Sequence, residues 1–158
     1  MMKHNKGFSL VELLVVVACL AALACVAAPN WIQSQWPRYQ LKGAVRQMAN
    51  DLRYARARSV STNREYRMMF DATLGSYVLE SGDQSSGSRQ WTATRAPTCF
   101  GPAGQGVFSN IRLVSVSTDR IVFKPTGNMT PTRMTLENTI GGTLQVVCAM
   151  SGRIRITR

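Results

Sequence analysis

The chain has 158 residues, is 45% hydrophobic and carries a formal charge of +11 at pH 7. This length suits one domain plus a hydrophobic segment, and the composition excludes an intrinsically disordered chain. Arginine supplies 15 of the 19 basic residues. The charge therefore predicts acidic partners such as nucleic acid, anionic lipid or an acidic protein face, with a merely soluble basic surface as the alternative.

An apolar run of 21 residues, 8–28, follows a short basic leader. As a helix it would span roughly 32 Å, enough to cross the core of a bilayer. A retained anchor fits better than a cleaved secretory signal, because the run is long and its nearest processing feature, Gly7-Phe8, precedes it. Glu12 is anomalous here, since a carboxylate inside a membrane costs a few kcal/mol unless it is paired or near the interface.

The stretch KGFSLVELLVVVACLAALACVAAP resembles the class III signal of type IV pilins and type II secretion pseudopilins. The resemblance implies that a prepilin peptidase cuts after Gly7 and methylates Phe8. It also implies that Glu12 pairs with the free amino group of a neighbouring subunit's first residue in a filament. The alternative is that Glu12 extends to the lipid headgroups near the helix end.

The same resemblance places the protein in the bacterial inner membrane as a single-pass chain with its C-terminal domain in the periplasm. Its partners would be the peptidase and other pilin or pseudopilin subunits, with which it would enter a pilus or pseudopilus. The expected organisation is a leader at 1–7, a transmembrane helix at 8–28, an amphipathic helix extension at 29–62 and a periplasmic β-rich domain at 63–158.

Residues 39–61 carry apolar side chains at spacings of three and four, which predicts one stripe of an amphipathic helix. We expect this stripe to pack on a β-sheet rather than to form a groove for a partner. Pro29 and Pro37 should bend or interrupt the helix. The arginines beside the stripe, Arg56 among them, either extend a basic surface or form its solvated face. The stripe consists of Leu41, Ala44, Val45, Met48, Leu52 and Ala55.

From residue 63 the pattern changes to short β-like runs separated by turn residues. A long helix followed by strands predicts an α+β fold in which the helix packs on an antiparallel β-sheet domain, as in type IV pilin-like proteins. Residues 81–90 are expected to form a flexible loop, and residues 95–106 an irregular segment. The predicted strands are 66–70, 76–81, 90–94, 107–117, 120–124, 133–137, 144–150 and 153–157.

Three blocks of the second half, LRYARARSVSTNREYRMMFD, DRIVFKPTGNM and SGRIRITR, resemble the GspH/FimT branch of the pseudopilin family. The middle block is similar to its F-x-P-x-G strand and turn, with Phe123, Pro125 and Gly127. The likeness implies a minor pilin or pseudopilin, a structural subunit that initiates or caps a pilus-like filament of a type II secretion or type IV pilus system.

Two cysteines of the second half and the only histidine constrain the chemistry. Outside the cytoplasm, Cys99 and Cys148 are predicted to form a disulfide, with two free buried thiols as the alternative. The sequence has no CxxC and no Cys/His cluster, so we expect no metal site. His4 lies in the predicted leader, the carboxylates are scattered and no phosphate-binding loop is present. We therefore expect no catalytic residue, no cofactor and no enzyme activity.

The C-terminal SGRIRITR is the main candidate for binding. Ser151-Gly152 predicts a two-residue turn, after which Arg153 and Arg155 would share one strand face, roughly 6.8 Å apart. This ending resembles the DNA-binding tail of FimT-type minor pilins. The likeness implies sequence-independent contacts with the backbone of double-stranded DNA, with Arg158 as a third residue, and capture of DNA for natural transformation as the alternative function. Otherwise these arginines would protect an edge strand from aggregation.

Overall fold

The computed structural model describes residues 9–71, 73–101 and 108–158. For residues 25–34 it describes the backbone alone. The chain divides into two compact units, Met1–Trp36 and Pro37–Arg158. Gly7 and Phe8 lie outside the described residues, as does the rest of the predicted leader.

The described residues contain a single helix, α1 (Leu10–Thr62), which supplies 53 residues to the two units. The helix continues through Pro29 and Pro37, so neither proline interrupts it, and the predicted bend stays a prediction. The helix ends at Thr62 and is followed by Asn63, whose positive φ of 51° is typical of a left-handed helix cap. The N–H of Arg64 then donates to the carbonyl of Ser59 at 3.3 Å, which satisfies one of the last free carbonyls of the helix.

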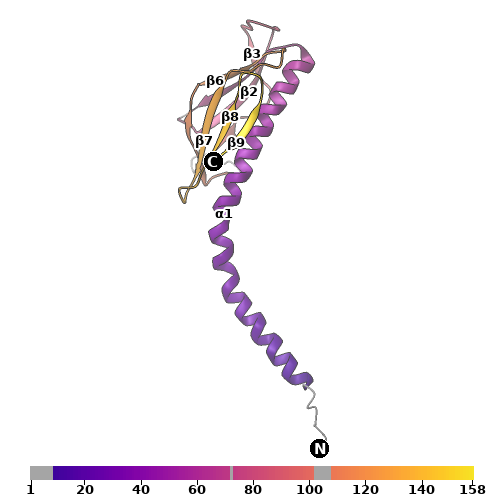
Figure 1. The fold of residues 1–158 in the computed structure, drawn as a ribbon, viewed down its shortest axis with the longest axis vertical. Coiled ribbons are helices and arrows are strands. Elements are labelled where there is room, and N and C mark those ends of the chain that lie inside the picture. The colour runs from indigo at the N-terminus through magenta and orange to yellow at the C-terminus, as the bar shows by residue number, and fades with distance from the viewer. Residues whose placement is uncertain (1–8, 72, 102–107) are drawn as a thin grey trace, which may run out of the picture. The chain divides into compact units, whose positions relative to one another are not determined.

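After the helix, the chain forms two antiparallel sheets rather than one. The first sheet has the order β3-β2-β1-β6, with β4 also paired to β2, and the second has the order β5-β7-β8-β9. Figure 1 shows these sheets lying along the second half of α1. The strands are β1 (Tyr66–Asp71), β2 (Ser76–Gly82), β3 (Trp91–Ala93), β4 (Thr98–Cys99), β5 (Ile111–Val116), β6 (Arg120–Phe123), β7 (Thr132–Asn138), β8 (Thr143–Cys148) and β9 (Ile154–Thr157).

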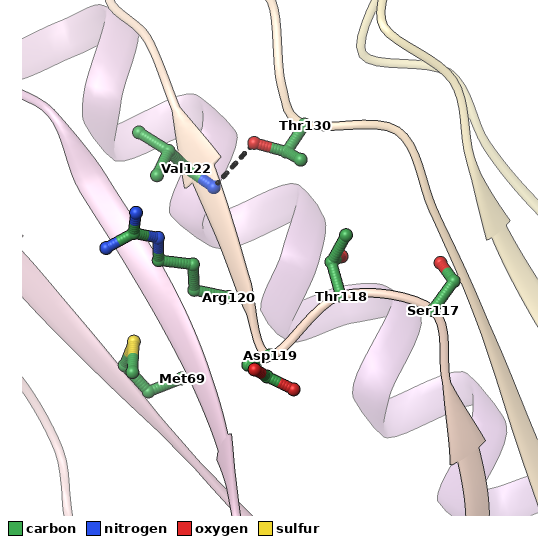
Figure 2. Close-up of a pocket in the computed structure, with 7 residues that line it drawn as sticks. All are labelled: Met69, Ser117, Thr118, Asp119, Arg120, Val122 and Thr130. Carbon is green, nitrogen blue, oxygen red and sulfur yellow. Dashed lines mark hydrogen bonds between the residues drawn. The ribbon is translucent and has the colours of Figure 1, made fainter.

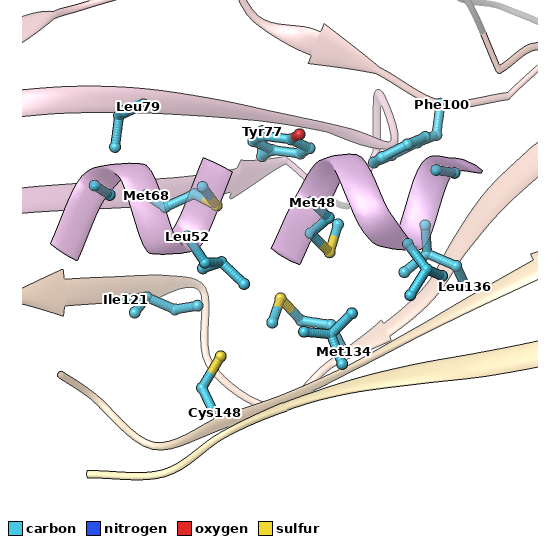
Figure 3. Packing of buried hydrophobic residues seen from close by; sticks show 14 of the residues in the cluster. Met48, Leu52, Met68, Tyr77, Leu79, Phe100, Ile121, Met134, Leu136 and Cys148 are labelled. Carbon is cyan, nitrogen blue, oxygen red and sulfur yellow. The ribbon is translucent and has the colours of Figure 1, made fainter. Parts of the chain in front are cut away.

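The core of this unit lies between the helix and the two sheets (Figure 3). All six predicted stripe residues of the helix are buried. They meet Met68, Tyr77 and Leu79 from the first sheet, and Met134 and Leu136 from the second. The expectation that the stripe packs on β-structure is therefore confirmed, and so is the α+β fold. Burying a side chain such as Leu52 contributes about 1.5–3 kcal/mol.

A polar contact at the edge of this core joins the helix to the first sheet. The hydroxyl of Tyr77 donates to the carboxylate of Asp51 at 2.7 Å, and Arg95 approaches the same carboxylate at 3.4 Å. The guanidinium of Arg95 also lies 4.3 Å from the ring centre of Tyr54. Burial, reinforced by the Asp51 carboxylate, raises the pKa of Tyr77 far above its ordinary value of 10.0.

Two loop expectations differ from the structure. The segment 83–90 is held by hydrogen bonds, because Asp83 accepts the N–H groups of Arg89 and Gln90 and the buried Glu65 accepts that of Ser88. A loop predicted to be flexible is therefore anchored at several points. Within 95–106, residues 98–99 form β4, a strand that the Pro/Gly-rich composition conceals.

The predicted Cys99–Cys148 disulfide is not formed in the structure, where both side chains are free thiols. Cys99 belongs to β4, which pairs with the first sheet, whereas Cys148 ends β8 in the second sheet. Cys148 is buried within the hydrophobic core, and this burial raises its pKa to about 11. Cys99, by contrast, is only half-buried, so the two thiols lie in different surroundings.

Candidate functional site

The first candidate surface is the start of α1. Every side chain from Ser9 to Ala24 is exposed, including a series of leucines and valines. The run is apolar on all sides, a pattern typical of helices surrounded by lipid or by other helices. No helix in the described part of the chain is both long enough and apolar enough to qualify as a membrane span.

Glu12 lies in the first turn of this helix, and its side chain is exposed. A carboxylate at this position interacts favourably with the partial positive charge of the helix N-terminus, by about 0.3–1 kcal/mol at an exposed site. The residues that would be cut and methylated, Gly7 and Phe8, are outside the described residues.

The second candidate surface is the C-terminal hairpin of β8 and β9. Its loop has three residues, 150–152, rather than the two predicted: the N–H of Gly152 donates to the carbonyl of Ala149, and the N–H of Ala149 donates to that of Arg153. Gly152 has a positive φ of 81°, as the last residue of such a three-residue loop requires. The extra residue leaves the predicted alternation of β9 intact.

The register of the second sheet shows which residues share its outer face. Arg155 lies opposite Val147, and Val147 lies opposite Arg133 on β7. The neighbouring pair, Cys148 and Ile154, faces the core instead. Arg133, Arg153, Arg155 and the terminal Arg158 are all exposed.

Arg133 is thus a member of this face that sequence inspection did not identify. It lies two strands from Arg155, roughly 10 Å away by ordinary strand spacing, while Arg153 lies roughly 6.8 Å from Arg155 along the strand. In the sequence from 132 to 158, Glu137 is the only acidic residue. These exposed arginines form a cationic face that can contact several phosphates or carboxylates at once.

The sequence predicted that Arg56 extends a basic surface or lies on a solvated face of the helix, but the structure gives it backbone contacts instead. Its side chain is half-buried, and its Nε donates to the carbonyl of Gly127 at 2.8 Å. Its Nη2 lies 3.5 Å from the carbonyl of Ser151, in the β8–β9 loop. Arg56 therefore joins the helix to the turn of the F-x-P-x-G block and to the C-terminal hairpin.

A pocket of about 630 Å³ opens beside β6 (Figure 2). Its hydroxyl groups are used within the fold: Thr130 accepts the N–H of Val122 at 3.2 Å, Ser117 accepts that of Arg133, and Thr118 contacts Thr132. The first of these bonds reaches β6, and the other two join the loop before β6 to β7. Among the described residues, no three His, Cys, Asp or Glu side chains are grouped so that they could hold a metal ion.

Comparison with known proteins identifies the family of the chain and similar folds. The chain matches the family model of the type II transport protein GspH over residues 44–152, and the prokaryotic N-terminal methylation motif over residues 2–27. A search of curated proteins finds no matching relative.

Three solved structures have a similar fold. The minor pseudopilin EpsH from the Type 2 Secretion System of Vibrio cholerae is 10% identical, with a TM-score of 0.58 over 75% of this chain and 96% of that chain. The solution structure of GspH from E. coli is 13% identical, with a TM-score of 0.57 over 75% and 88% of the two chains. The type IV minor pilin FimU of Pseudomonas aeruginosa is 17% identical, with a TM-score of 0.54 over 75% and 93%.

Proposed function

The chain belongs to the GspH family, whose model it matches over more than half of its length, and we propose that it is a structural subunit that initiates or caps a pilus-like filament. The filament would belong to a type II secretion or a type IV pilus system. The observation that carries this proposal is the exposed apolar surface of α1 between residues 9 and 24. Packing of such helices against one another would remove this surface from water.

The path to the filament would begin in the inner membrane. Residues 8–28 would anchor the precursor, with residues 37–158 in the periplasm. A prepilin peptidase would cut after Gly7 and methylate Phe8, which becomes the first residue of the mature chain. The match to an N-terminal methylation motif supports this processing. Other pilin or pseudopilin subunits would then surround the apolar helix.

Glu12 would pair with the amino group of a neighbouring subunit's first residue, since a buried carboxylate is tolerated when it is paired with a cation. We expect Glu12→Ala and Glu12→Gln to insert into the membrane normally but to enter filaments at least about tenfold less, equivalent to ~1.4 kcal/mol. Quantifying the protein in sheared filaments and in membranes tests this. Asp119→Ala, at an exposed carboxylate of the other unit, is the matched control. Normal incorporation of both Glu12 variants would disprove the pairing.

A second candidate function is binding of DNA at the cationic face of the second sheet. The observation that favours it is the register that places Arg133 on the same face as Arg153 and Arg155, with Arg158 beside the end of β9. Contacts to phosphates would make this binding independent of sequence and strongly dependent on salt. In this role the subunit would capture extracellular double-stranded DNA for natural transformation.

A salt titration of DNA binding by the full chain in nonionic detergent micelles tests this second function. Arg153→Ala/Arg155→Ala should weaken binding and reduce the slope of log K against log salt by about 2, because two phosphate contacts are lost. Arg53→Ala/Arg58→Ala removes the same charge from exposed positions of α1 and serves as the control. Equal losses in both double variants would leave only a general effect of charge, and absence of binding by the wild type would remove this function.

A further inference from the structure

We infer that Arg56 is a positioning residue that holds the C-terminal arginine hairpin in its binding conformation by joining two glycine turns to the helix. The inference rests on the second candidate function, DNA binding, because it concerns how Arg153 and Arg155 are presented. Arg56 itself is half-buried and hydrogen-bonded to the backbone, so it acts through the hairpin rather than as a further phosphate contact.

The two turns have the same hydrogen-bond pattern. In the first, Gly127 N–H donates to Lys124 C=O, and Lys124 N–H donates to Asn128 C=O, both at 2.9 Å. In the second, the same two bonds run from Gly152 to Ala149 and from Ala149 to Arg153, again at 2.9 Å. The N–H of Met129 also donates to the carbonyl of Met150 at 3.1 Å, which links the two turns directly.

The guanidinium of Arg56 lies between these turns. Its Nε donates to Gly127 at 2.8 Å, and its Nη2 makes a longer contact to Ser151. A Cβ atom at position 152 would lie 2.5 Å from the carbonyl oxygen of Gly127 and would also collide with the guanidinium. Glycine at 152 therefore permits both the positive φ and the close approach of the two turns.

The hairpin needs such a support because β9 is short and lies at the edge of its sheet. Among the strands that the structure describes, it is paired with β8 alone, through four residue pairs. Arg155 lies on its outer face and Arg153 directly precedes the strand, so two like charges stand close together and repel each other at this edge. Fixing the turn that precedes β9 reduces the conformational entropy that an anion would otherwise have to remove on binding.

Arginine is suited to this role, and lysine is not. The planar guanidinium presents several N–H donors in a fixed arrangement, so one side chain can bind two carbonyl groups in different turns. A lysine would keep the charge but could not reproduce this geometry. Charge and positioning can therefore be separated by Arg56→Lys.

The test measures DNA binding and amide hydrogen exchange in the full chain in nonionic detergent micelles. Arg56→Lys and Gly152→Ala should each weaken binding about tenfold and lower the salt slope by about 1 to 2, because fewer arginines reach phosphates together. Arg53→Lys, on an exposed position of the same helix, should change binding less than about twofold. Gly141→Ala controls for the positive φ, since Gly141 has a φ of 77° but no atom within 4 Å of its added Cβ.

Hydrogen exchange supplies a readout that is independent of DNA. In Arg56→Lys, the amides of Gly152, Ala149 and Met129 should exchange at least about tenfold faster, because the bonds they donate belong to the two joined turns. The amide of Gly141 donates in an equivalent turn that Arg56 does not touch, and its exchange should not change. A merely structural role would instead accelerate exchange throughout the core.

A double-mutant cycle measures whether Arg56 acts on DNA binding through Arg153 and Arg155. In an Arg153→Ala/Arg155→Ala background, Arg56→Lys should cause no further loss of DNA binding, since the residues it positions are already absent. An additive loss, or unchanged binding and local exchange in Arg56→Lys, would overturn the inference. If the wild type binds no DNA, the second function fails and the functional half of this inference fails with it. The exchange pattern would still decide whether Arg56 holds the hairpin.

Discussion

Two parts of helix α1 use apolar side chains in opposite ways. Between residues 10 and 24 they occur on all sides of the helix and are exposed, as Leu20 is at 60%. Between residues 41 and 55 they recur every three or four positions and are buried, as Leu52 is at 0%. The comparison shows that a stripe allows the chain to build a core with its own sheets. A surface that is apolar all round calls instead for lipid or other helices.

The strongest way to sharpen this comparison is to shorten one leucine in each part of the helix. Leu52→Ala should destabilise the folded unit by about 2–5 kcal/mol, because a fully buried side chain leaves a cavity. Leu20→Ala should change the unfolding free energy of that unit by less than about 0.5 kcal/mol, since its side chain is exposed. Thermal unfolding in detergent micelles measures both. Equal destabilisation by the two variants would break the comparison.

A smaller effect is expected at the polar edge of the core. Because the pKa of Tyr77 is raised in the folded state, the folded protein keeps its phenolic proton while the unfolded chain loses it near pH 10. The stabilisation from Tyr77 is thus fully present below pH 10 and is lost as the pH rises further. Tyr77→Phe should cost about 1 kcal/mol at neutral pH and flatten this alkaline decline. Identical dependence of stability on pH in the wild type and the variant would contradict the raised pKa of Tyr77.

The smallest expected effect is a difference in reactivity between two thiols, measured without any substitution. Both Cys99 and Cys148 should be free, and Cys99 should react faster with iodoacetamide at pH 8. Burial keeps Cys148 protonated and covered, with its pKa raised to about 11. Mass spectrometry of the peptides that contain Cys99 and Cys148, after labelling of the folded protein, measures the two rates separately from Cys19 and Cys25. If both peptides stay unlabelled in the unfolded chain until a reductant is added, the disulfide forms after all.

The sequence allowed the local features to be predicted and concealed those that depend on distant contacts. The helix stripe was predictable because its spacing follows from helix geometry, and the β-rich second half followed from alternation and turn residues. The division into two sheets was not, since it depends on which strands pair. Strand β4 has two residues, too few for a periodic signal.

The candidate site shows the same limit. Alternation along β9 placed Arg153 and Arg155 on one face without knowledge of the fold. Arg133 joins them only through the register of β7 and β9 against β8. Arg56 resembles the other arginines of its helix in sequence, and its role depends on two turns that lie 71 and 95 residues further along the chain. A helical arginine followed by two glycine turns is too general a pattern to reveal that contact.

The most direct test of the central claim is the intact mass of the chain recovered from sheared filaments. If the protein is a processed filament subunit, this mass should correspond to loss of residues 1–7 and gain of one methyl group on Phe8. The chain should also be present together with other pilin or pseudopilin subunits. A chain found only in membranes with an intact leader would contradict the account.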